Sequence, residues 1–487
     1  MLEPGRAGGG DYKTYQIVGL FLGPIAFAAM LLSPAPQGLS ATGWTTAALA
    51  VWMAVWWATE ALPLFATALL PLVMLPLLGI ANLNAAAVPF ANPVVFLLFG
   101  GFLIALAVER WNLHRRIAFH IILGIGNRPL NLIAGVMLAS AALSMWISNT
   151  ATTVMMLPIA VSLVGVVLPA GRDHGSDGRN FAAAMMLGVA YAASIGGMAT
   201  LIGSPPNALA ASYLGQAFNV QVSFAEWMAI ALPIAAVMLA LAFPILTRLA
   251  FPFSKALSAT ETNVAADMLR EMGPISVPEK RVAAIFALVA AGWILHPLFG
   301  GSGGLGLTDT GIAIAGAIAL FAVPADWRQK RFLLDWATAR KAPFDSLILF
   351  GGGLSLAHAI EISGLATWIG NGLSFLHGMP LIVLVAGVCL LVVFLTELMS
   401  NTATAAAFLP VAGSLAIGAE VAPLLIGIAV GLAASSAYML PVATLPNALV
   451  FGTGLVSLPQ MLRAGFILSL VGAAVIAAGV TLAARFL

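Results

Sequence analysis

Ser148-Asn149-Thr150-Ala151-Thr152 lies in the middle of a long apolar segment, and it recurs in the second half of the chain as Ser400-Asn401-Thr402-Ala403-Thr404. Two other motifs recur in the same order: Leu98-Phe99-Gly100-Gly101 as Leu349-Phe350-Gly351-Gly352, and Pro206-Asn207-Ala208-Leu209 as Pro446-Asn447-Ala448-Leu449. Motifs that keep their order and nearly their spacing indicate a duplicated structural unit. The chain is therefore predicted to fold as two related halves.

The composition places this duplication in a membrane. The chain has 487 residues, of which 61% are hydrophobic and only 8% charged, and its mean hydropathy is +1.04. Soluble domains carry about 25% charged residues. Apolar stretches of about 20 residues recur along the chain, and each can cross a hydrocarbon core about 30 Å thick. The sequence predicts an all-α polytopic membrane protein embedded in a lipid bilayer, and the net charge of +2 argues against a nucleic-acid partner.

We expect about 11 transmembrane helices plus two re-entrant hairpins, at 131–168 and 380–418, and two interrupted spans, at 182–214 and 421–455. With a cytoplasmic N-terminus, and with each hairpin entering and leaving on one side, every Lys and Arg except Arg485 falls on the cytoplasmic side. This is the positive-inside bias. It predicts a multi-pass protein of the cell inner (plasma) membrane.

Each half then has five full spans and one hairpin, so the second half is inverted relative to the first. Inverted repeats with interrupted helices in matching places point to a transporter site near the bilayer midplane. Ser, Asn and Thr inside an apolar segment are costly unless their polar atoms are used, and these residue types favour caps and turns. We therefore place Ser148–Thr150 and Ser400–Thr402 at the hairpin tips.

A hairpin tip exposes the N-terminus of the outgoing helix, where free backbone N–H groups and a partial positive charge can bind a carboxylate without Lys or Arg. The Gly- and Pro-rich segments 194–207 and 441–447 are predicted to be unwound. Unwound backbone offers carbonyl oxygens that suit a hard cation such as Na⁺. Two tips and two breaks predict two cation sites that flank one anion site.

Two acidic residues in apolar surroundings are weaker candidates, because an acid inside a membrane is a functional suspect by default. Glu60 follows an apolar run, and Glu397 lies three residues before the second tip. For Glu397 we weigh a role in orienting the tip or taking a proton against a structural hydrogen-bonding role, and favour the structural one.

At these residues the chain resembles the divalent anion:sodium symporter family, the INDY-type dicarboxylate carriers, from about residue 15 to the end. The resemblance is carried by these motifs: Trp57-Ala58-Thr59-Glu60-Ala61-Leu62-Pro63, Ser144-Met145-Trp146-Ile147 before Ser148-Asn149-Thr150, Gly203-Ser204-Pro205-Pro206-Asn207, Thr396-Glu397 before Ser400-Asn401-Thr402, and Pro441-Val442-Ala443-Thr444 before Pro446-Asn447. It implies a homodimer in which a transport domain slides like an elevator against a scaffold domain.

The implied division of the chain is as follows: a disordered cytoplasmic tail at 1–14, scaffold at 15–128 and 282–378, transport domain with hairpin and broken helix at 129–255 and 379–487, and a cytoplasmic linker at 256–281. The resemblance also assigns residues. A first sodium site is implied at Ser144, Ser148, Asn149 and Gly197, and a second at Thr396, Met399, Asn401, Ala443 and Leu445. Contacts to the carboxylates are implied at Asn149, Thr150, Ser400, Asn401, Thr402 and Thr444.

The chain leaves the family pattern at one place. Where the family usually reads Thr-Pro-Pro-Asn in the second half, this chain has Thr444-Leu445-Pro446-Asn447. The sequence favours a secondary transporter that imports a C4-dicarboxylate such as succinate, malate or fumarate with two or more Na⁺ as coupling ions. The alternatives are a sodium-independent dicarboxylate exchanger and a sulfate or citrate symporter. No Lys, Arg or His stands among the assigned residues, which favours cotransport over exchange.

Two rivals come from other classes. An anion channel needs a continuous polar pore and not two occluding tips. An intramembrane enzyme is disfavoured, because the sequence places no Ser–His pair and no metal set.

Overall fold

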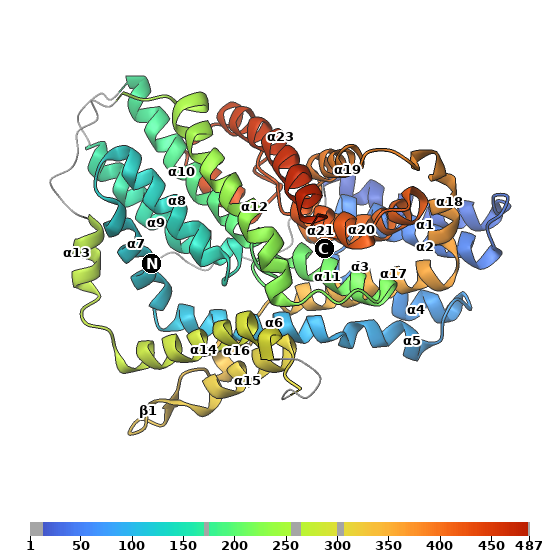
Figure 1. Cartoon of the computed structure of the whole chain (residues 1–487), viewed down its shortest axis with the longest axis horizontal. Coiled ribbons are helices and arrows are strands. Elements are labelled where there is room, and N and C mark those ends of the chain that lie inside the picture. Colours follow the sequence, from blue (N-terminus) through green and yellow to red (C-terminus); the bar gives the residue numbers. More distant parts are fainter. Residues whose placement is uncertain (1–12, 170–174, 255–263, 300–305, 486–487) are drawn as a thin grey trace.

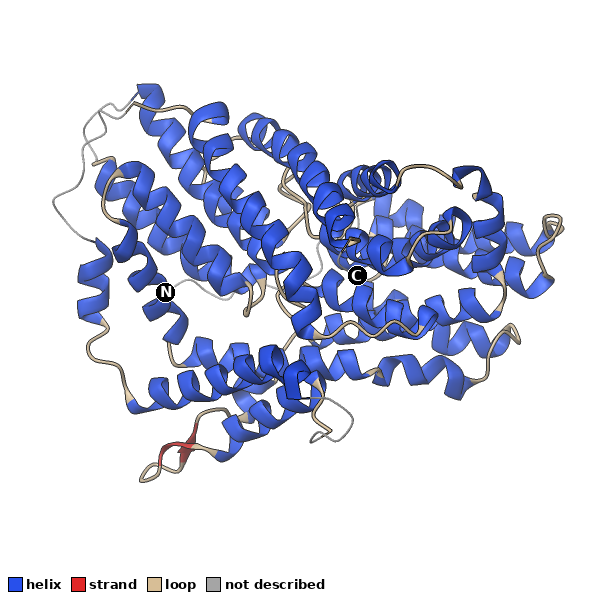
Figure 2. Ribbon diagram, viewed as in Figure 1, coloured by secondary structure: helices blue, strands red, loops and turns tan. Residues whose placement is uncertain are grey.

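The computed structural model of the chain describes residues 13–169, 175–254, 264–299 and 306–485. These residues are almost entirely helical (Figure 2), with one short antiparallel pair of strands, β1 (Pro324–Asp326) and β2 (Arg331–Phe332). The predicted all-α fold class is thereby confirmed.

The first half contains these helices in chain order: α1 (Thr14–Leu32), α2 (Ala41–Thr59), α3 (Leu64–Thr67), α4 (Leu70–Leu77), α5 (Leu83–Ala87), the 3₁₀ turn η1 (Val88–Ala91), α6 (Pro93–Arg110), α7 (Leu113–Ile125), α8 (Pro129–Ser144), α9 (Asn149–Val167), α10 (Gly175–Met198), α11 (Pro205–Phe218), α12 (Phe224–Pro244), the π-helical turn η2 (Ile245–Ala250) and α13 (Val264–Glu271).

The second half continues with α14 (Val277–Phe299), α15 (Asp309–Ala322), α16 (Trp336–Ala339), α17 (Phe344–Ile362), α18 (Leu365–Gly372), η3 (Ser374–Leu376), α19 (Leu381–Leu395), α20 (Asn401–Ala419), α21 (Pro423–Ala434), α22 (Leu445–Phe451) and α23 (Leu458–Ala483). The motif-bearing helices α8 to α11 thus have counterparts in α19 to α22.

Within the described ranges, eight helices are long and apolar enough to cross a membrane. They are Thr14–Leu32, Leu83–Arg110, Asn149–Val167, Gly175–Met198, Phe224–Ala250, Phe344–Ile362, Asn401–Ala419 and Leu458–Ala483. Shorter apolar helical stretches cover Leu64–Leu77, Pro129–Ser144, Asp309–Ala322, Leu381–Leu395 and Pro423–Ala434. Each predicted hairpin and each predicted interrupted span corresponds to two successive helices. The hairpins are α8 with α9 and α19 with α20, and the interrupted spans are α10 with α11 and α21 with α22.

Local chemistry fixes where helices begin. Ser40, Asn92 and Ser223 each precede a helix, and each side chain accepts a hydrogen bond from a backbone N–H of its first turn. Such caps satisfy donors that have no partner inside the helix. Proline stands at the first or second position of α8, α11, α21 and α22, where its missing N–H costs nothing.

Helix α10 forms the centre of one side of the molecule, and every residue of its most apolar stretch is buried. It is rich in Ala and Gly, and it packs against α8, α9, α12 and α22, so that elements of both halves surround it (Figure 1). A Cβ added at Gly196 would overlap the backbone of Ala141 in α8, so this close approach requires glycine. Helix α1, by contrast, lies at the periphery, and only 11% of the residues in its apolar stretch are buried.

The structure differs from the sequence-based expectation in several elements. The apolar stretch Leu64–Leu77, which the composition favours as one span, is divided into α3 and α4, because Pro71 lacks the N–H that would continue the helix. The amphipathic helices α7 and α13 and the short α18 were not expected, since each is too short or too polar to be predicted as a span.

Two expected segments fall largely outside the described residues. Of the tail at 1–14 only residues 13 and 14 are described, and α1 begins at Thr14. The linker at 256–281 is described from residue 264 onward, where it contains α13 and the start of α14.

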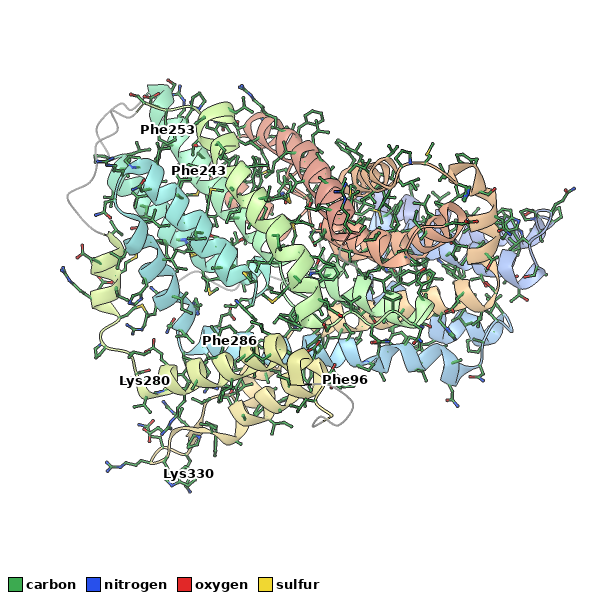
Figure 3. All side chains as sticks on the ribbon, viewed as in Figure 1. Phe96, Phe243, Phe253, Lys280, Phe286 and Lys330 are labelled. Carbon is green, nitrogen blue, oxygen red and sulfur yellow. The ribbon has the colours of Figure 1, made fainter. Side chains whose placement is uncertain are left out.

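Basic side chains gather where α14 begins and where the β1–β2 hairpin projects; Lys280 and Lys330 are labelled there in Figure 3. At this end Arg116 of α7 forms a bidentate pair with Glu279 of α14, at 2.9 and 3.4 Å, and donates to the Gly273 carbonyl at 3.0 Å. This largely buried contact joins α7, which leads into α8, to the segment that follows α13.

Candidate functional site

Both predicted tips are short loops that open a helix. Four residues, Met145 to Ser148, connect α8 to α9, and Ser148 caps α9 by accepting from the Ala151 N–H at 3.3 Å. In the second half, residues 396–400 connect α19 to α20. Each outgoing helix has 19 residues, so each tip presents a full helix N-terminus with its partial positive charge.

The same contact closes each tip. The Ser144 hydroxyl donates to Oδ1 of Asn149 at 2.6 Å, and the Thr396 hydroxyl lies 2.8 Å from Oδ1 of Asn401. A hydroxyl at the end of one helix thereby holds the asparagine that begins the next. The structure brings together the side chains of Ser144 and Asn149, and those of Thr396 and Asn401, as the sequence prediction requires.

Both interrupted spans contain a break, but the predicted bounds of the unwound segments are wrong. Residues 194–198 end α10, and residues 205–207 and 445–447 begin α11 and α22, because proline is tolerated in the first turn of a helix. Between α10 and α11 the chain is unwound from Ala199 to Ser204, and between α21 and α22 from Ser435 to Thr444. Each break is held by the asparagine of the repeated Pro-Asn motif.

Asn207 donates through Nδ2 to the carbonyls of Gly197, Met198 and Thr200, at 2.9, 3.2 and 2.7 Å. In the second half, Asn447 donates to the carbonyls of Ala437 and Leu440, at 3.3 and 3.1 Å. The role of these two asparagines is not among the expectations from the sequence. The recurrence of Pro-Asn in both halves is the signal that could have identified them.

Oxygen atoms converge at the first tip and break. A Cβ at Gly197 would overlap Oδ1 of Asn149 and lie 3.0 Å from the Gly203 carbonyl oxygen, and a Cβ at Gly203 would lie 2.8 Å from the Ser144 carbonyl oxygen. With its amide turned over, Asn149 would donate from the same position to Ser144 Oγ, Gly203 O and Ala193 O, at 2.6, 3.3 and 3.1 Å. The end of the Asn149 side-chain amide is thus surrounded by hydrogen-bond acceptors.

Such a cluster can be satisfied in two ways: by an amide N–H₂ facing the oxygens, or by a cation among them with the amide oxygen as a further ligand. Hard cations take carbonyl, hydroxyl and amide oxygens. Gly197 allows this approach, because any side chain there would fill the space. Three residues assigned to the first site therefore meet at one place, Ser144, Asn149 and Gly197. The fourth, Ser148, uses its hydroxyl to cap α9. Gly203 and Ala193 were not foreseen.

The second cluster is less complete. The Thr396 hydroxyl lies 2.8 Å from Asn401 Oδ1 and also 2.8 Å from the Ala434 carbonyl. One hydroxyl proton cannot satisfy both acceptors, so this position also has an excess of oxygen.

Met399, Ala443 and Leu445 were expected to contribute mainly backbone oxygens. Among the described contacts, no hydrogen bond joins them to Thr396 or Asn401, and their role stays a prediction. Ala443 is 7% exposed, whereas the Leu445 side chain is 64% exposed.

The expected carboxylate contacts lie at helix beginnings. Asn149 and Thr150 begin α9, Asn401 and Thr402 begin α20, Ser400 precedes α20, and Thr444 precedes α22, where it caps the helix by accepting from the Asn447 N–H at 3.2 Å. Residues 144–150, 193–207, 396–402 and 434–447 contain no Lys, Arg or His. An anion at these tips would be held by backbone N–H groups, hydroxyls and amides.

Glu397 is the acid of this region, and it holds the second break. Its carboxyl is 1% exposed and accepts from three consecutive backbone N–H groups, those of Tyr438 and Met439 at Oε1 (2.6 and 2.8 Å) and Leu440 at Oε2 (3.0 Å). This contact bears out the structural role favoured from the sequence.

Glu60 has no comparable place. It ends α2 in the left-handed conformation (φ 47°), is exposed, and its carbonyl accepts from Gln16. The structure places Glu60 at the end of α2 and not inside a helix, so a functional role for this acid is not supported.

In the first half the break is held differently. The Thr200 hydroxyl donates to the Met145 carbonyl and accepts from the Gly203 N–H at 3.0 Å. Met145 occupies the position in the first repeat that Glu397 occupies in the second.

Paired polar helix starts and unwound segments inside an apolar helical chain define a polytopic membrane protein of the transporter class. A family model described as "Sodium:sulfate symporter transmembrane region" matches residues 14–484. The chain belongs to this symporter family.

Relatives of known name are similar over nearly the whole chain. A "Sodium-dependent dicarboxylate transporter SdcS" of Staphylococcus saprophyticus is 38% identical over 475 residues, which cover 96% of this chain and 91% of the relative. The protein of the same name from Staphylococcus aureus is 39% identical over 470 residues, 96% of this chain and 90% of the relative. A solved structure, the Alcanivorax borkumensis YdaH transporter, matches with a TM-score of 0.56 and 16% identity over 97% of each chain, which supports the fold.

Proposed function

We propose that this protein is a secondary active transporter that imports a C4-dicarboxylate of the succinate, malate or fumarate type together with two or more Na⁺. The observation that carries the proposal is the pair of tips: each joins a helix N-terminus to a cluster of uncharged oxygens, without a fixed positive charge. Na⁺ then supplies the positive charge that a dianion needs. The printed names of the relatives, sodium-dependent dicarboxylate transporters, support the same cargo and coupling ion.

The charge balance sets the energetics of this proposal. Two Na⁺ neutralise a dicarboxylate, and each ion that moves down a tenfold gradient supplies about 1.4 kcal/mol. A third ion would make transport electrogenic and add about 2.3 kcal/mol per 100 mV. Two oxygen clusters provide for two ions.

We further propose an elevator mechanism in a homodimer, with scaffold at 15–128 and 282–378 and a transport domain at 129–255 and 379–487. The packing of α9 and α10 with α22, and of α11 with α20 and α21, supports a transport domain built from both halves. Location in the plasma membrane with a cytoplasmic N-terminus belongs to the same proposal and rests on the distribution of Lys and Arg.

A second candidate cargo is sulfate, which the description of the matching family model favours. Sulfate is also a dianion, and it could lie between the same helix N-termini. It differs in having one charge centre and not two separated carboxylates, so that the two tips would have to approach one another more closely.

The test is uptake of labelled succinate into proteoliposomes without internal anion, with an inward Na⁺ gradient compared with an equal K⁺ gradient. Uptake with Na⁺ only is expected, and Asn149→Ala or Asn401→Ala should abolish it. Asn84→Ala, in exposed α5, is the matched control and should transport normally. Uptake that ignores Na⁺ but appears with dicarboxylate inside would establish an exchanger. Uptake of sulfate or citrate but not of succinate would replace the cargo.

A further inference from the structure

The two breaks touch through a pair of buried hydroxyls. Ser204, which precedes α11 in the first repeat, and Ser435, which follows α21 in the second, have side-chain oxygens 2.8 Å apart. Both residues are almost completely buried, at 1% and 0% exposure. The contact joins positions 231 residues apart in the chain.

The hydrogen bond between the Ser204 and Ser435 hydroxyls does not cap either helix. The Oγ of Ser435 lies 3.2 Å from the carbonyl oxygen of Gly431 and donates its single proton to it. Ser435 therefore accepts the hydrogen bond from the Ser204 hydroxyl. Ser204 stands at the capping position of α11 but accepts no hydrogen bond from that helix, whereas Ser148 and Thr444 cap their own helices. The Ser204 hydroxyl is used only across the repeats among the described contacts.

This hydrogen bond completes a path between the two oxygen clusters. Ser204 directly follows Gly203, whose carbonyl oxygen lies in the first cluster beside Asn149. Ser435 directly follows Ala434, whose carbonyl lies 2.8 Å from the Thr396 hydroxyl of the second cluster. Two peptide units and one hydrogen bond between hydroxyls therefore connect the clusters.

We propose that Ser204 and Ser435 are a positioning pair that couples the two cation sites, so that Na⁺ in one repeat favours binding of Na⁺ in the other. The inference deepens the proposed function and rests on it. An ion that fixes the Gly203 carbonyl also fixes Ser204, which in turn restrains Ser435 and the Ala434 carbonyl. Coupling requires that binding of one ion changes the arrangement of the oxygen atoms that bind the other ion. The path through Ser204 and Ser435 supplies the physical connection.

The test is the Na⁺ dependence of initial succinate uptake at saturating succinate in proteoliposomes. The unaltered protein should show a sigmoidal dependence. Ser204→Ala removes the donor without leaving Ser435 unsatisfied, so it should lower the Hill coefficient toward 1 and raise the half-saturating Na⁺ concentration roughly 2- to 10-fold, as expected for one neutral hydrogen bond. Ser204→Thr, which keeps the hydroxyl, should restore the sigmoidal shape.

Ser435→Ala should also lower the Hill coefficient, and the double variant should be no worse than Ser204→Ala, because the two residues share one bond. Ser414→Ala is the control, since this buried hydroxyl bonds only the Pro410 carbonyl of its own helix; its curve should match that of the unaltered protein. An unchanged Hill coefficient in Ser204→Ala, or strictly additive effects in the double variant, would overturn the coupling. Uptake without any Na⁺ dependence in the unaltered protein would instead overturn the proposed function.

Discussion

Glu397→Gln tests how the second break is held. The Glu397 carboxyl accepts from the N–H groups of Tyr438 and Met439 at one oxygen and from that of Leu440 at the other. Gln keeps one oxygen and places an amide N–H₂ against the third donor. A buried donor without a partner costs about 1–3 kcal/mol, and weaker bonds to the remaining two N–H groups add about 1 kcal/mol. We expect the free energy of unfolding to fall by about 2–4 kcal/mol.

The measurement is equilibrium unfolding of the purified protein by SDS titration in mixed micelles. Glu361→Gln, at the end of α17 with 44% of its side chain exposed, is the matched control and should stay within about 0.5 kcal/mol of the unaltered protein. If the free energy of unfolding of Glu397→Gln also stays within that margin, the carboxyl does not hold the break, and its three hydrogen bonds contribute little to stability.

Three further outcomes are expected. Gly197→Ala would place a Cβ against Oδ1 of Asn149 and should reduce Na⁺-driven succinate uptake at least about tenfold, because the first oxygen cluster can no longer close around an ion. Arg116→Met would leave buried Glu279 without its bidentate partner and should lower the free energy of unfolding by about 1–3 kcal/mol in the same titration. Trp293→Ala would remove the α14 ring on which Trp146 of the first tip stacks, and should lower the free energy of unfolding by about 3–5 kcal/mol.

Each has a control that leaves the contact intact. Gly165→Ala, where an added Cβ meets nothing within 4 Å, should leave uptake unchanged. Arg115→Met, at an exposed position on α7, should change stability by less than about 1 kcal/mol. Trp336→Ala, at a site 67% exposed, should be nearly neutral. Equal effects of a variant and its control would contradict the contact in question.

The sequence predicted well the places where helices must stop. Each Ser-Asn-Thr motif stands where a new helix begins, and each Gly- and Pro-rich segment contains unwound backbone, although part of each segment is helical. The positions of the helix ends depend on local backbone chemistry, which a sequence displays directly. The family resemblance, and not the backbone chemistry, assigned Ser144 with Asn149 and Thr396 with Asn401 to common sites, and the structure places the side chains of each pair in contact.

The partners of buried groups could not be predicted in the same way. Nothing near Glu397 in the sequence shows that its carboxyl receives three N–H groups of residues 438–440, because that contact depends on how α19 packs against α21. The same holds for Ser204 and Ser435. Glu60 was overvalued because the apolar pattern alone does not show that α2 ends there in a left-handed turn.

The first tip has a further feature that the sequence did not reveal. Trp146 stacks on Trp293 (6.4 Å between ring centroids, 7° between planes) and on Phe224, and it meets the edge of Phe286. In the second repeat the corresponding residue, Leu398, is 70% exposed. Among the described residues, these ring contacts join the first tip to α14, and the second tip has no equivalent ring contact.

The different supports of the two breaks have a consequence for the history of the chain. A hydroxyl, that of Thr200, holds one break, and a carboxyl, that of Glu397, holds the other. After the duplication, the copies kept a common backbone outline but came to depend on different side chains. A protein assembled from two copies of the first half would have no acid beneath either break, and one assembled from two copies of the second would have two. Neither present half, joined to a copy of itself, would reproduce the two different supports that this protein has.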